Sequence, residues 1–330
     1  MTMLDNYFPF YALAFLATLL LTVILEKRLI PALTRSAKQP IYEEGPSWHM
    51  KKSGTPTMGG IAFLIAILTV SVPALLVFSI ASQKEEAVSL SVLLIYALAN
   101  AAIGILDDIK KLRKKQNEGL SASQKLLLQA LAAVLFLLLR RVLLSDTTAI
   151  LFSFGWLELG LFYYPLAMLV LLGCVNCANL TDGIDGLAAA VAFGAGLSLF
   201  YISSAFIPHV TYLSACLMGA TAGFLFFNLH PAKIFMGDTG SLFLGALVGG
   251  ASFSFSNPIL VLSFGSVYAI EGISVILQVL FYKCTRRRIF KMAPLHHHLE
   301  KSGWSENKIC IAAMLATLVF SIPVYILYLP

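Results

Sequence analysis

Long apolar runs alternate with short polar segments along this chain of 330 residues. A run of about 20 apolar residues can cross a hydrocarbon core about 30 Å thick as a helix, and no alternation of period two, typical of a membrane barrel, is visible. The pattern predicts an all-α integral membrane protein whose residues 1–330 form a single polytopic domain. The ten predicted spans are Phe8–Leu25, Met58–Ile80, Ala87–Leu106, Leu126–Leu144, Leu161–Ala178, Leu187–Ile207, Val210–Leu229, Ser241–Phe255, Ile259–Tyr282 and Ile309–Leu329.

The composition and the ends of the runs agree with a membrane protein. Hydrophobic residues make up 58% of the chain and charged residues 12%, whereas soluble domains use roughly 45–50% apolar residues. Pro208 and Pro258 fall between predicted spans, as expected of a residue that cannot continue a helix. No basic segment with a small-residue cleavage site precedes the first span, so we interpret it as a retained helix.

Lysine and arginine are distributed asymmetrically. Segments 26–57, 107–125, 228–240 and 283–308 hold 20 of the 23 basic residues, and ten spans bring all of them to one side. Basic loops face the cytoplasm, so we predict a multi-pass membrane protein with both termini outside. The net charge of +6 indicates membrane lipids and phosphate compounds as partners. Without a basic stripe interleaved with aromatic residues, nucleic acid is not expected.

Acidic residues stand at the ends of the apolar runs, where a carboxylate is costly unless it faces protein, water, a metal or a substrate. They are the pair Asp107 and Asp108, the pair Asp182 and Asp185, and the single Asp238. The same arrangement of ten spans places all five aspartates, together with the histidines of segment 296–298, on the side of the membrane that carries the basic loops. Since the charge count used neither aspartate nor histidine, two independent signals predict one charged site at the cytoplasmic face.

The first polar strings have the chemistry of phosphate and metal binding. KKSGTPTMGG, residues 51–60, offers backbone N–H groups, hydroxyls and the charge of Lys52 to an anion, although a flexible turn before a helix would look similar. ILDDIKK, residues 105–111, carries two adjacent carboxylates, which repel each other unless a cation such as Mg²⁺ bridges them. A solvated helix end above anionic lipid would explain the lysines of this string but not its aspartates.

The later strings extend the same chemistry. In NLTDGIDGLA, residues 179–188, a helical turn would place Asp182 and Asp185 on one face; helix capping would explain only one of them. Asp238 precedes a helix start that could bind phosphate. Three consecutive histidines cannot converge on one metal, so one or two acting as phosphate donors or acid–base groups is the favoured interpretation, with a solvated tract as the alternative. Glu271, in mid-span, is interpreted as interior and hydrogen-bonded.

These strings together resemble a known family. KKSGTPTMGG, ILDDIKK with NEGLS, NLTDGIDGLA, NLHPAKIFMGDTGSL and MAPLHHHLE occur in the order found in the polyprenyl-phosphate N-acetylhexosamine-1-phosphate transferases. The triple histidine and the GTPTMGG loop resemble the phospho-N-acetylmuramoyl-pentapeptide transferase branch. Ile109 and Leu299 stand where the family often has Tyr and Phe, which affects local packing rather than chemistry.

The resemblance implies a Mg²⁺-dependent, homodimeric enzyme of the bacterial inner membrane. It would move phospho-MurNAc-pentapeptide from UDP-MurNAc-pentapeptide to undecaprenyl phosphate. The products would be lipid I and UMP, in the first membrane step of peptidoglycan synthesis. By motif, the resemblance implies that the catalytic residues are Asp107, Asp108, Asp238 and His297, with Asp238 as the metal ligand, and that the substrate-binding residues are Lys52, Thr57, Lys111, Asn179, Asp182, Asp185, Asn228, Phe235, Gln278 and His296.

General phosphoryl-transfer chemistry agrees with this assignment, because attack on a pyrophosphate needs neutralised charge and a stabilised leaving group. A phosphate monoester has a second pKa near 6, so the lipid phosphate needs little help from a base. We therefore favour direct attack, with Asp107 positioning the nucleophile or removing any residual proton, over a covalent aspartyl intermediate. Two alternatives stay open: a GlcNAc-1-phosphate transferase of the same superfamily, and a proton-coupled transporter, which would carry acids deep within its spans.

Overall fold

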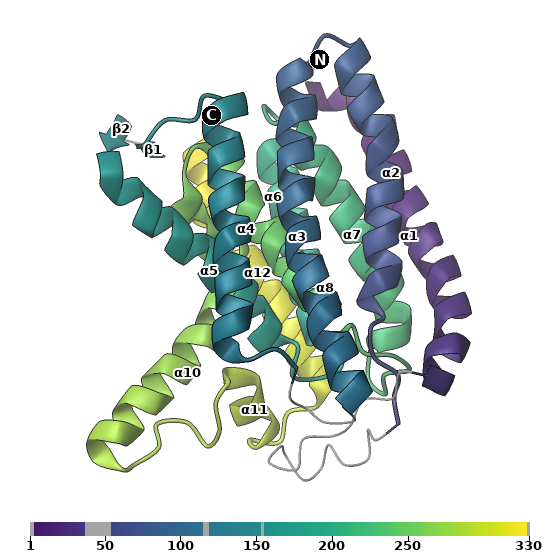
Figure 1. Cartoon of the computed structure of the whole chain (residues 1–330), viewed down its shortest axis with the longest axis vertical. Helices are drawn as coiled ribbons and strands as arrows, with labels where there is room; N and C mark the ends of the chain where they lie inside the picture. The colour runs from purple at the N-terminus through teal and green to yellow at the C-terminus, as the bar shows by residue number, and fades with distance from the viewer. Residues whose placement is uncertain (1–2, 37–53, 115–118, 153–154, 329–330) are drawn as a thin grey trace.

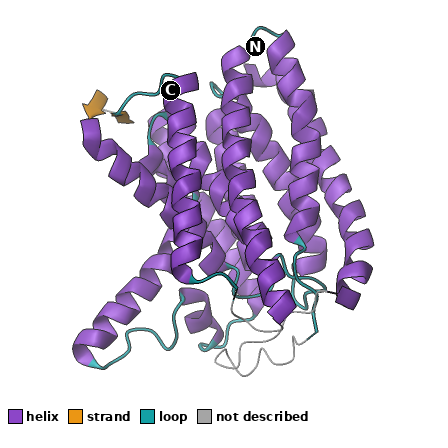
Figure 2. Ribbon diagram, viewed as in Figure 1, coloured by secondary structure: helices purple, strands orange, loops and turns teal. Residues whose placement is uncertain are grey.

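The protein is a bundle of long helices with one small β-hairpin (Figures 1 and 2). Its computed structural model describes residues 3–36, 54–114, 119–152 and 155–328. The predicted binding residue Lys52 lies outside the described residues. The all-α membrane fold is confirmed. The hairpin was not foreseen: β1 (Ala149–Phe152) pairs antiparallel with β2 (Gly155–Glu158) between the fourth and fifth long helices.

The order of the helices follows the apolar runs. The α-helices are α1 (Met3–Ser36), α2 (Gly60–Ile80), α3 (Lys84–Lys114), α4 (Ala122–Leu143), α5 (Tyr163–Thr181), α6 (Leu187–Ser203), α7 (Pro208–Asn228), α8 (Gly237–Ala251), α9 (Val261–Phe264), α10 (Ser266–Thr285), α11 (Leu295–Glu300) and α12 (Glu306–Tyr328). Short 3₁₀ turns are η2 (Gly160–Phe162), η3 (Ser252–Phe255) and η4 (Pro258–Leu260).

Among the described helices, eight are long and apolar enough to cross a membrane. Each of the ten predicted spans contains a helix, but α6 has 17 residues and α8 only 15. The ninth predicted span is interrupted: η4 and α9 precede Gly265, and the long helix α10 starts only at Ser266. Pro258 begins this irregular segment, in keeping with its place at the first residue of a helical turn.

The short helix α8 forms the centre of the bundle. Its residues from Thr239 to Ala251 are all buried, and it packs along α3 and α5, while α7 packs against α1 and α6. Glycine allows the approach of α3 to α8, because a Cβ atom at Gly104 would lie 2.4 Å from the carbonyl oxygen of Asp238. A helix enclosed in this way can be short, since other helices rather than lipid cover its sides.

The polar segments gather at one end of the bundle. Both chain termini lie at the top of Figure 1, whereas α11 and the start of α4 lie at the bottom. The last turns of α5 and α7 and the first turn of α8 belong to this lower end, because Asn179 contacts Asp238 and Asn228 contacts Gly186. Loops that are far apart in the sequence therefore lie together, as predicted from the order of the spans and the basic segments.

Candidate active site

Three carboxylates meet where α3 approaches the start of α8. Oxygen atoms of Asp107, Asp108 and Asp238 lie within 4.8 Å of one another. Asp107 and Asp108 belong to the final turns of α3, and Asp238 belongs to the first turn of α8. The structure therefore joins two of the acidic groups that the sequence singled out, from segments 130 residues apart.

Asp108 fastens the N-terminus of α8. Its Oδ1 accepts a hydrogen bond from the backbone N–H of Asp238 at 3.1 Å. Its Oδ2 accepts one from the N–H of Thr239 at 2.9 Å and one from the Thr239 hydroxyl at 2.7 Å. The first N–H groups of a helix have no partner within the helix, so Asp108 acts as a cap supplied by a neighbouring helix. Its role is to hold Asp238 in place.

Asp107 faces a cation and a loop. Its Oδ2 lies 2.6 Å from Lys111 Nζ, one helical turn further along α3. Its Oδ1 accepts a hydrogen bond from the N–H of Leu120 at 2.7 Å. Gly119 lies against the same carboxylate, because a Cβ atom there would lie 2.3 Å from Oδ1. Gly119 and Leu120, just before α4, thus lie against Asp107, and a side chain at Gly119 would force the carboxylate to move.

Asp238 is the best-connected member of the cluster. Its Oδ2 lies 3.1 Å from Lys111 Nζ and 2.6 Å from Lys125 Nζ, and its Oδ1 accepts a hydrogen bond from Asn179 Nδ2 at 3.0 Å. Burial acts to raise the pKa of Asp238. The hydrogen bond with Asp107 and the charges of Lys111 and Lys125 outweigh burial and hold the pKa below its usual value, so the carboxylate is charged at neutral pH.

Lys125 is a residue of the site that the sequence analysis did not predict. It lies in the first turn of α4, and its Nζ also contacts Asn179 Oδ1 at 3.3 Å. A local signal was present: Ser121 and Gln124 form a capping box at the start of α4, with each side chain bonded to the other's backbone N–H. Such a box fixes a helix start. It places Lys125 at the site end of the bundle instead of in a solvated loop.

The loops at 54–60 and 234–237 form the next side of the site. The N–H of Phe235 donates to the carbonyl of Pro56 at 2.8 Å, and the N–H of Gly59 donates to the carbonyl of Phe235 at 2.9 Å. Thr57 is buried beside Gly237, where a Cβ atom would lie 3.0 Å from the Thr57 hydroxyl oxygen and 2.6 Å from Asp108 Oδ2. The predicted residues Thr57 and Phe235 are therefore neighbours of the carboxylate cluster.

The second acidic pair, Asp182 and Asp185, lies on the turn between α5 and α6, outside both helices. The prediction that the two residues share one face of a helix is therefore wrong. Asp182 is partly buried. Its pKa is raised well above the usual value, because burial and the nearby carboxylates of Asp238 and Asp108 disfavour its charged form. Asp182 thus belongs to the electrostatic surroundings of Asp238, whereas Asp185 has other partners.

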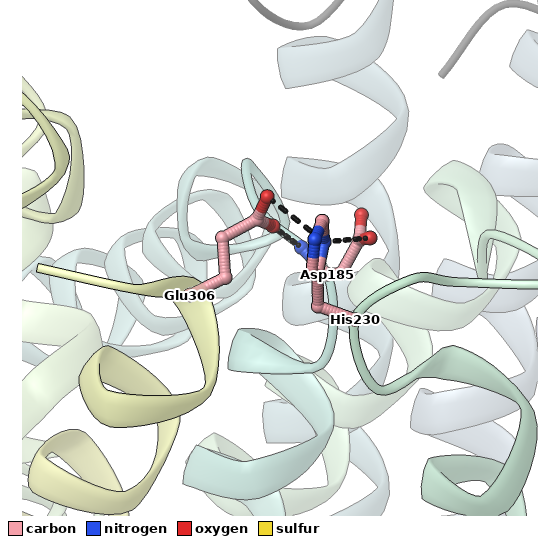
Figure 3. A group of neighbouring side chains, drawn as sticks. All are labelled: Asp185, His230 and Glu306. Carbon is pink, nitrogen blue, oxygen red and sulfur yellow. Dashed lines mark hydrogen bonds and ion pairs between the residues drawn. The ribbon is translucent and has the colours of Figure 1, made fainter. Parts of the chain in front are cut away.

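Asp185 belongs to a separate cluster with His230 and Glu306 (Figure 3). Neither His230 nor Glu306 was singled out in the sequence. His230 follows α7, and Glu306 is the first residue of α12. Asn228, a predicted binding residue, is buried nearby: its Oδ1 accepts from the N–H of Gly186 at 3.1 Å, and its Nδ2 donates to the carbonyl of Ile234 at 2.8 Å. Asn228 thereby joins two loops.

Two of the three histidines of α11 lie side by side, with the ring centroids of His296 and His297 4.2 Å apart, whereas His298 Nδ1 accepts a hydrogen bond from the N–H of Lys291 at 3.0 Å. His296 is fully buried; its backbone N–H donates to Glu271 at 3.2 Å, and its Nδ1 lies 3.2 Å from Glu271 Oε2. Its other ring nitrogen faces Gly183, where a Cβ atom would lie 2.3 Å from Nε2. His297 Nδ1 contacts Glu300 Oε2 at 2.6 Å. Glu271 is interior and hydrogen-bonded, as interpreted from the sequence.

Gln278 contacts the backbone of the α10–α11 loop rather than the carboxylates. Its Oε1 accepts hydrogen bonds from the N–H groups of Ile289 and Phe290 at 3.1 and 3.0 Å, and its Nε2 contacts the carbonyl of Phe290 at 3.4 Å. It therefore shapes the loop between α10 and α11. Of the predicted site residues that the structure describes, Lys111, Asn179 and Thr57 lie next to the carboxylate cluster of Asp107, Asp108 and Asp238. Gln278 instead binds the loop that leads to the histidines of α11.

The carboxylate cluster has the ligands that a divalent metal ion needs. Carboxylate oxygens are the preferred ligands of Mg²⁺, and those of Asp107, Asp108 and Asp238 lie close enough together to hold one ion. Lys111 and Lys125 place ammonium groups against the same oxygens. The residues therefore attract positive charge and fit a metal ion.

Comparisons with known proteins identify the family. Residues 89–256 match glycosyl transferase family 4, and residues 52–64 match signature 1 of the phospho-N-acetylmuramoyl-pentapeptide transferases. A protein of that name from Halalkalibacterium halodurans is 43% identical over 319 residues, which cover 94% of each chain. The chain belongs to the phospho-N-acetylmuramoyl-pentapeptide transferase family. This membership confirms the resemblance of the motifs.

Other members of the transferase family match to a similar extent. The protein of this name from Bacillus subtilis is 41% identical over 315 residues, which cover 92% of this chain and 93% of the relative. The protein from Desulfitobacterium hafniense is 40% identical over 332 residues, which cover 96% and 97%. Since the relatives are transferases over almost their whole length, the transporter interpretation is wrong, and the chain is a multi-pass membrane transferase.

Proposed function

We propose that this transferase moves phospho-MurNAc-pentapeptide from UDP-MurNAc-pentapeptide to undecaprenyl phosphate, giving lipid I and UMP. The observation that carries the proposal is the meeting of Asp107 and Asp238 with Lys111 and Lys125 at the ends of α3, α4 and α8. Transfer between two phosphate compounds brings several negative charges together, and paired cations and metal-binding carboxylates are the groups that stabilise them.

In the proposed reaction, an oxygen of the lipid phosphate attacks the phosphorus that bears the sugar. The bond from that phosphorus to the bridging oxygen breaks, and UMP leaves with the electron pair. Lys111 and Lys125 would lower the repulsion between the two anions, and Asp107 would orient the attacking phosphate. A bound Mg²⁺ would neutralise charge on the pyrophosphate and on the departing UMP.

We assign the nucleotide end of the donor to the surface around Asp182, Asn179 and Phe235. Asn179 touches Asp238 directly, and the loop containing Phe235 runs straight into Asp238, so a donor lying across these segments would present its pyrophosphate to the carboxylates. His296 and His297 would border the same space from α11. We also propose that the site faces the cytoplasm, that both termini lie outside, and that the enzyme is a homodimer with one membrane domain per chain.

The test is formation of both products by purified protein. The protein is incubated with UDP-MurNAc-pentapeptide, undecaprenyl phosphate and Mg²⁺, and UMP and the lipid product are measured together. We expect equal amounts of each, none without the lipid phosphate, and loss of both when EDTA removes the metal. A parallel reaction with UDP-GlcNAc should give no product. Transfer of GlcNAc phosphate with no reaction of the MurNAc donor would overturn the proposal.

A further inference from the structure

A histidine joins a buried and a partly buried carboxylate beside the proposed donor surface (Figure 3). His230 Nδ1 lies 3.0 Å from Asp185 Oδ2 and 3.1 Å from Glu306 Oε1. The Asp185 side chain is 2% exposed and that of Glu306 is 11% exposed, whereas that of His230 is 47% exposed. Two neighbouring carboxylates shielded from water repel each other unless a donor lies between them, and His230 is a donor to both. Its Nδ1 carries the hydrogen, because carboxylate oxygens only accept.

The same three residues connect three separate segments through their backbones. Asp185 Oδ2 also accepts a hydrogen bond from the N–H of Ala232 at 3.0 Å, in the loop after α7. The N–H of Asp185 donates to Glu306 Oε2 at 2.7 Å, at the start of α12. Next to them, Cys310 Sγ contacts the carbonyl of Asp185 at 3.2 Å. The turn between α5 and α6 is therefore tied both to the α7–α8 loop and to α12.

The tied turn lies between two parts of the candidate active site. Asn179, just before it, contacts Asp238, and Gly183 within it touches the ring of the buried His296. The loop of His230 leads within eight residues to Asp238. A shift of the turn would therefore move Asp182 and the loop of Phe235 relative to Asp238. The carboxylate of Asp185 accepts hydrogen bonds from other residues of the protein, which distinguishes its role from the one proposed for Asp182.

We propose that His230 and Glu306 are positioning residues that set the affinity for the nucleotide-sugar donor by fixing the Asp185 turn against the Asp238 loop. The inference rests on the proposed function for its substrate. Because the contacts are made before and after the donor reacts, they contribute to binding in the ground state and in the transition state alike. Such an interaction appears in KM and leaves kcat nearly unchanged.

The experiment compares substitutions that keep or remove the contact of Nδ1. His230→Ala removes the donor that lies between Asp185 Oδ2 and Glu306 Oε1, and we expect KM for UDP-MurNAc-pentapeptide to rise roughly tenfold, the effect of losing a charge-assisted hydrogen bond. His230→Asn places an amide N–H near the position of Nδ1 and should restore most of the affinity. His230→Gln places its amide near Nε2 and should not restore it.

Two further variants complete the design. Glu306→Ala should raise KM in the same way, and combining it with His230→Ala should raise KM by less than the product of the single effects, because both act on one turn. His209→Ala is the stability control: His209 lies at the opposite end of the bundle, bonded to Glu86 at 2.6 Å and Ser254 at 2.9 Å. It should lower the melting temperature without changing KM.

The outcomes separate this inference from the proposed function. If the wild-type protein neither binds the MurNAc donor in calorimetry nor forms UMP, the proposed function fails. If the wild-type protein is active and His230→Ala shows an unchanged KM, or a lower kcat at unchanged KM, the positioning role is overturned. Equal recovery by His230→Asn and His230→Gln would also overturn it, because the effect would then not depend on Nδ1.

Discussion

Lys125 Nζ lies 2.6 Å from Asp238 Oδ2 and thereby joins the first turn of α4 to the first turn of α8. With Lys111 on the other side of the same oxygen, Asp238 is held between two ammonium groups. The arrangement has a direct consequence for catalysis, because the charges that balance Asp238 in the free protein are also the charges nearest to an incoming phosphate.

The first prediction concerns the charge of Lys125. Lys125→Met keeps much of the side chain's length and removes the ammonium group. We expect kcat/KM to fall roughly 10- to 100-fold, because stabilisation of the transferring phosphate is lost. Lys125→Arg, which retains the charge, should lose less. Steady-state release of UMP measures the effect, and equal activity of Lys125→Met and wild type would show that the charge is not used.

The second prediction follows from the raised pKa of Asp182. The folded protein holds this proton more tightly than the unfolded chain does, so stability decreases as pH rises from the unfolded pKa, about 4, through the folded one. Asp182→Asn removes that dependence. In the ligand-free protein, the variant should melt above wild type at about pH 8, and the gap should shrink towards about pH 4. A constant gap at every pH would contradict the assigned cause.

The third prediction concerns the glycine between α3 and α8. Gly104→Ala would bring a Cβ atom to 2.4 Å from the carbonyl oxygen of Asp238, so the helices must separate. We expect a loss of about 1–3 kcal/mol in the free energy of unfolding, as in other overpacked cores, and a lower kcat. The matched control is Gly173→Ala in α5, where a Cβ atom meets nothing within 4 Å. Equal tolerance of both would contradict the close packing.

The fourth prediction is topological. In a variant lacking the five native cysteines, a cysteine replaces the exposed Ser123 at the start of α4, Ser302 after α11, or Thr147 beyond the other end of α4. In intact cells, an impermeant thiol reagent should label the cysteine at position 147 and not those at 123 and 302. Permeabilised cells provide the control. Labelling of positions 123 and 302 from opposite faces would exclude a common cleft.

The arrangement of the spans could be predicted because apolar length is a strong and local signal. The interruption at Gly265 and the hairpin at 149–158 could not, because each depends on the elements around it. The short helix α8 also shows the limit of span counting, since burial on all sides allows 15 residues to form a complete element.

The site residues divide along a similar line. Carboxylates at the ends of apolar runs are conspicuous because they are costly there, which is why Asp107, Asp108 and Asp238 could be singled out. Lys125, His230 and Glu306 lie in polar segments where such residues are ordinary. Their roles arise from partners between 45 and 121 residues away, and no local pattern specifies those pairings.

The turnover of Asp238→Asn shows whether phosphate transfer depends on Asp238. The substitution is nearly isosteric and removes the negative charge that would hold the metal, so the donor should still bind. The melting temperature should fall, because Lys111 and Lys125 lose the charge of their shared partner. With the MurNAc donor, undecaprenyl phosphate and Mg²⁺ all saturating, we predict that UMP formation slows by at least roughly 100-fold. UMP formation within about twofold of the wild-type rate would show that phosphate transfer takes place without Asp238 and would contradict the account.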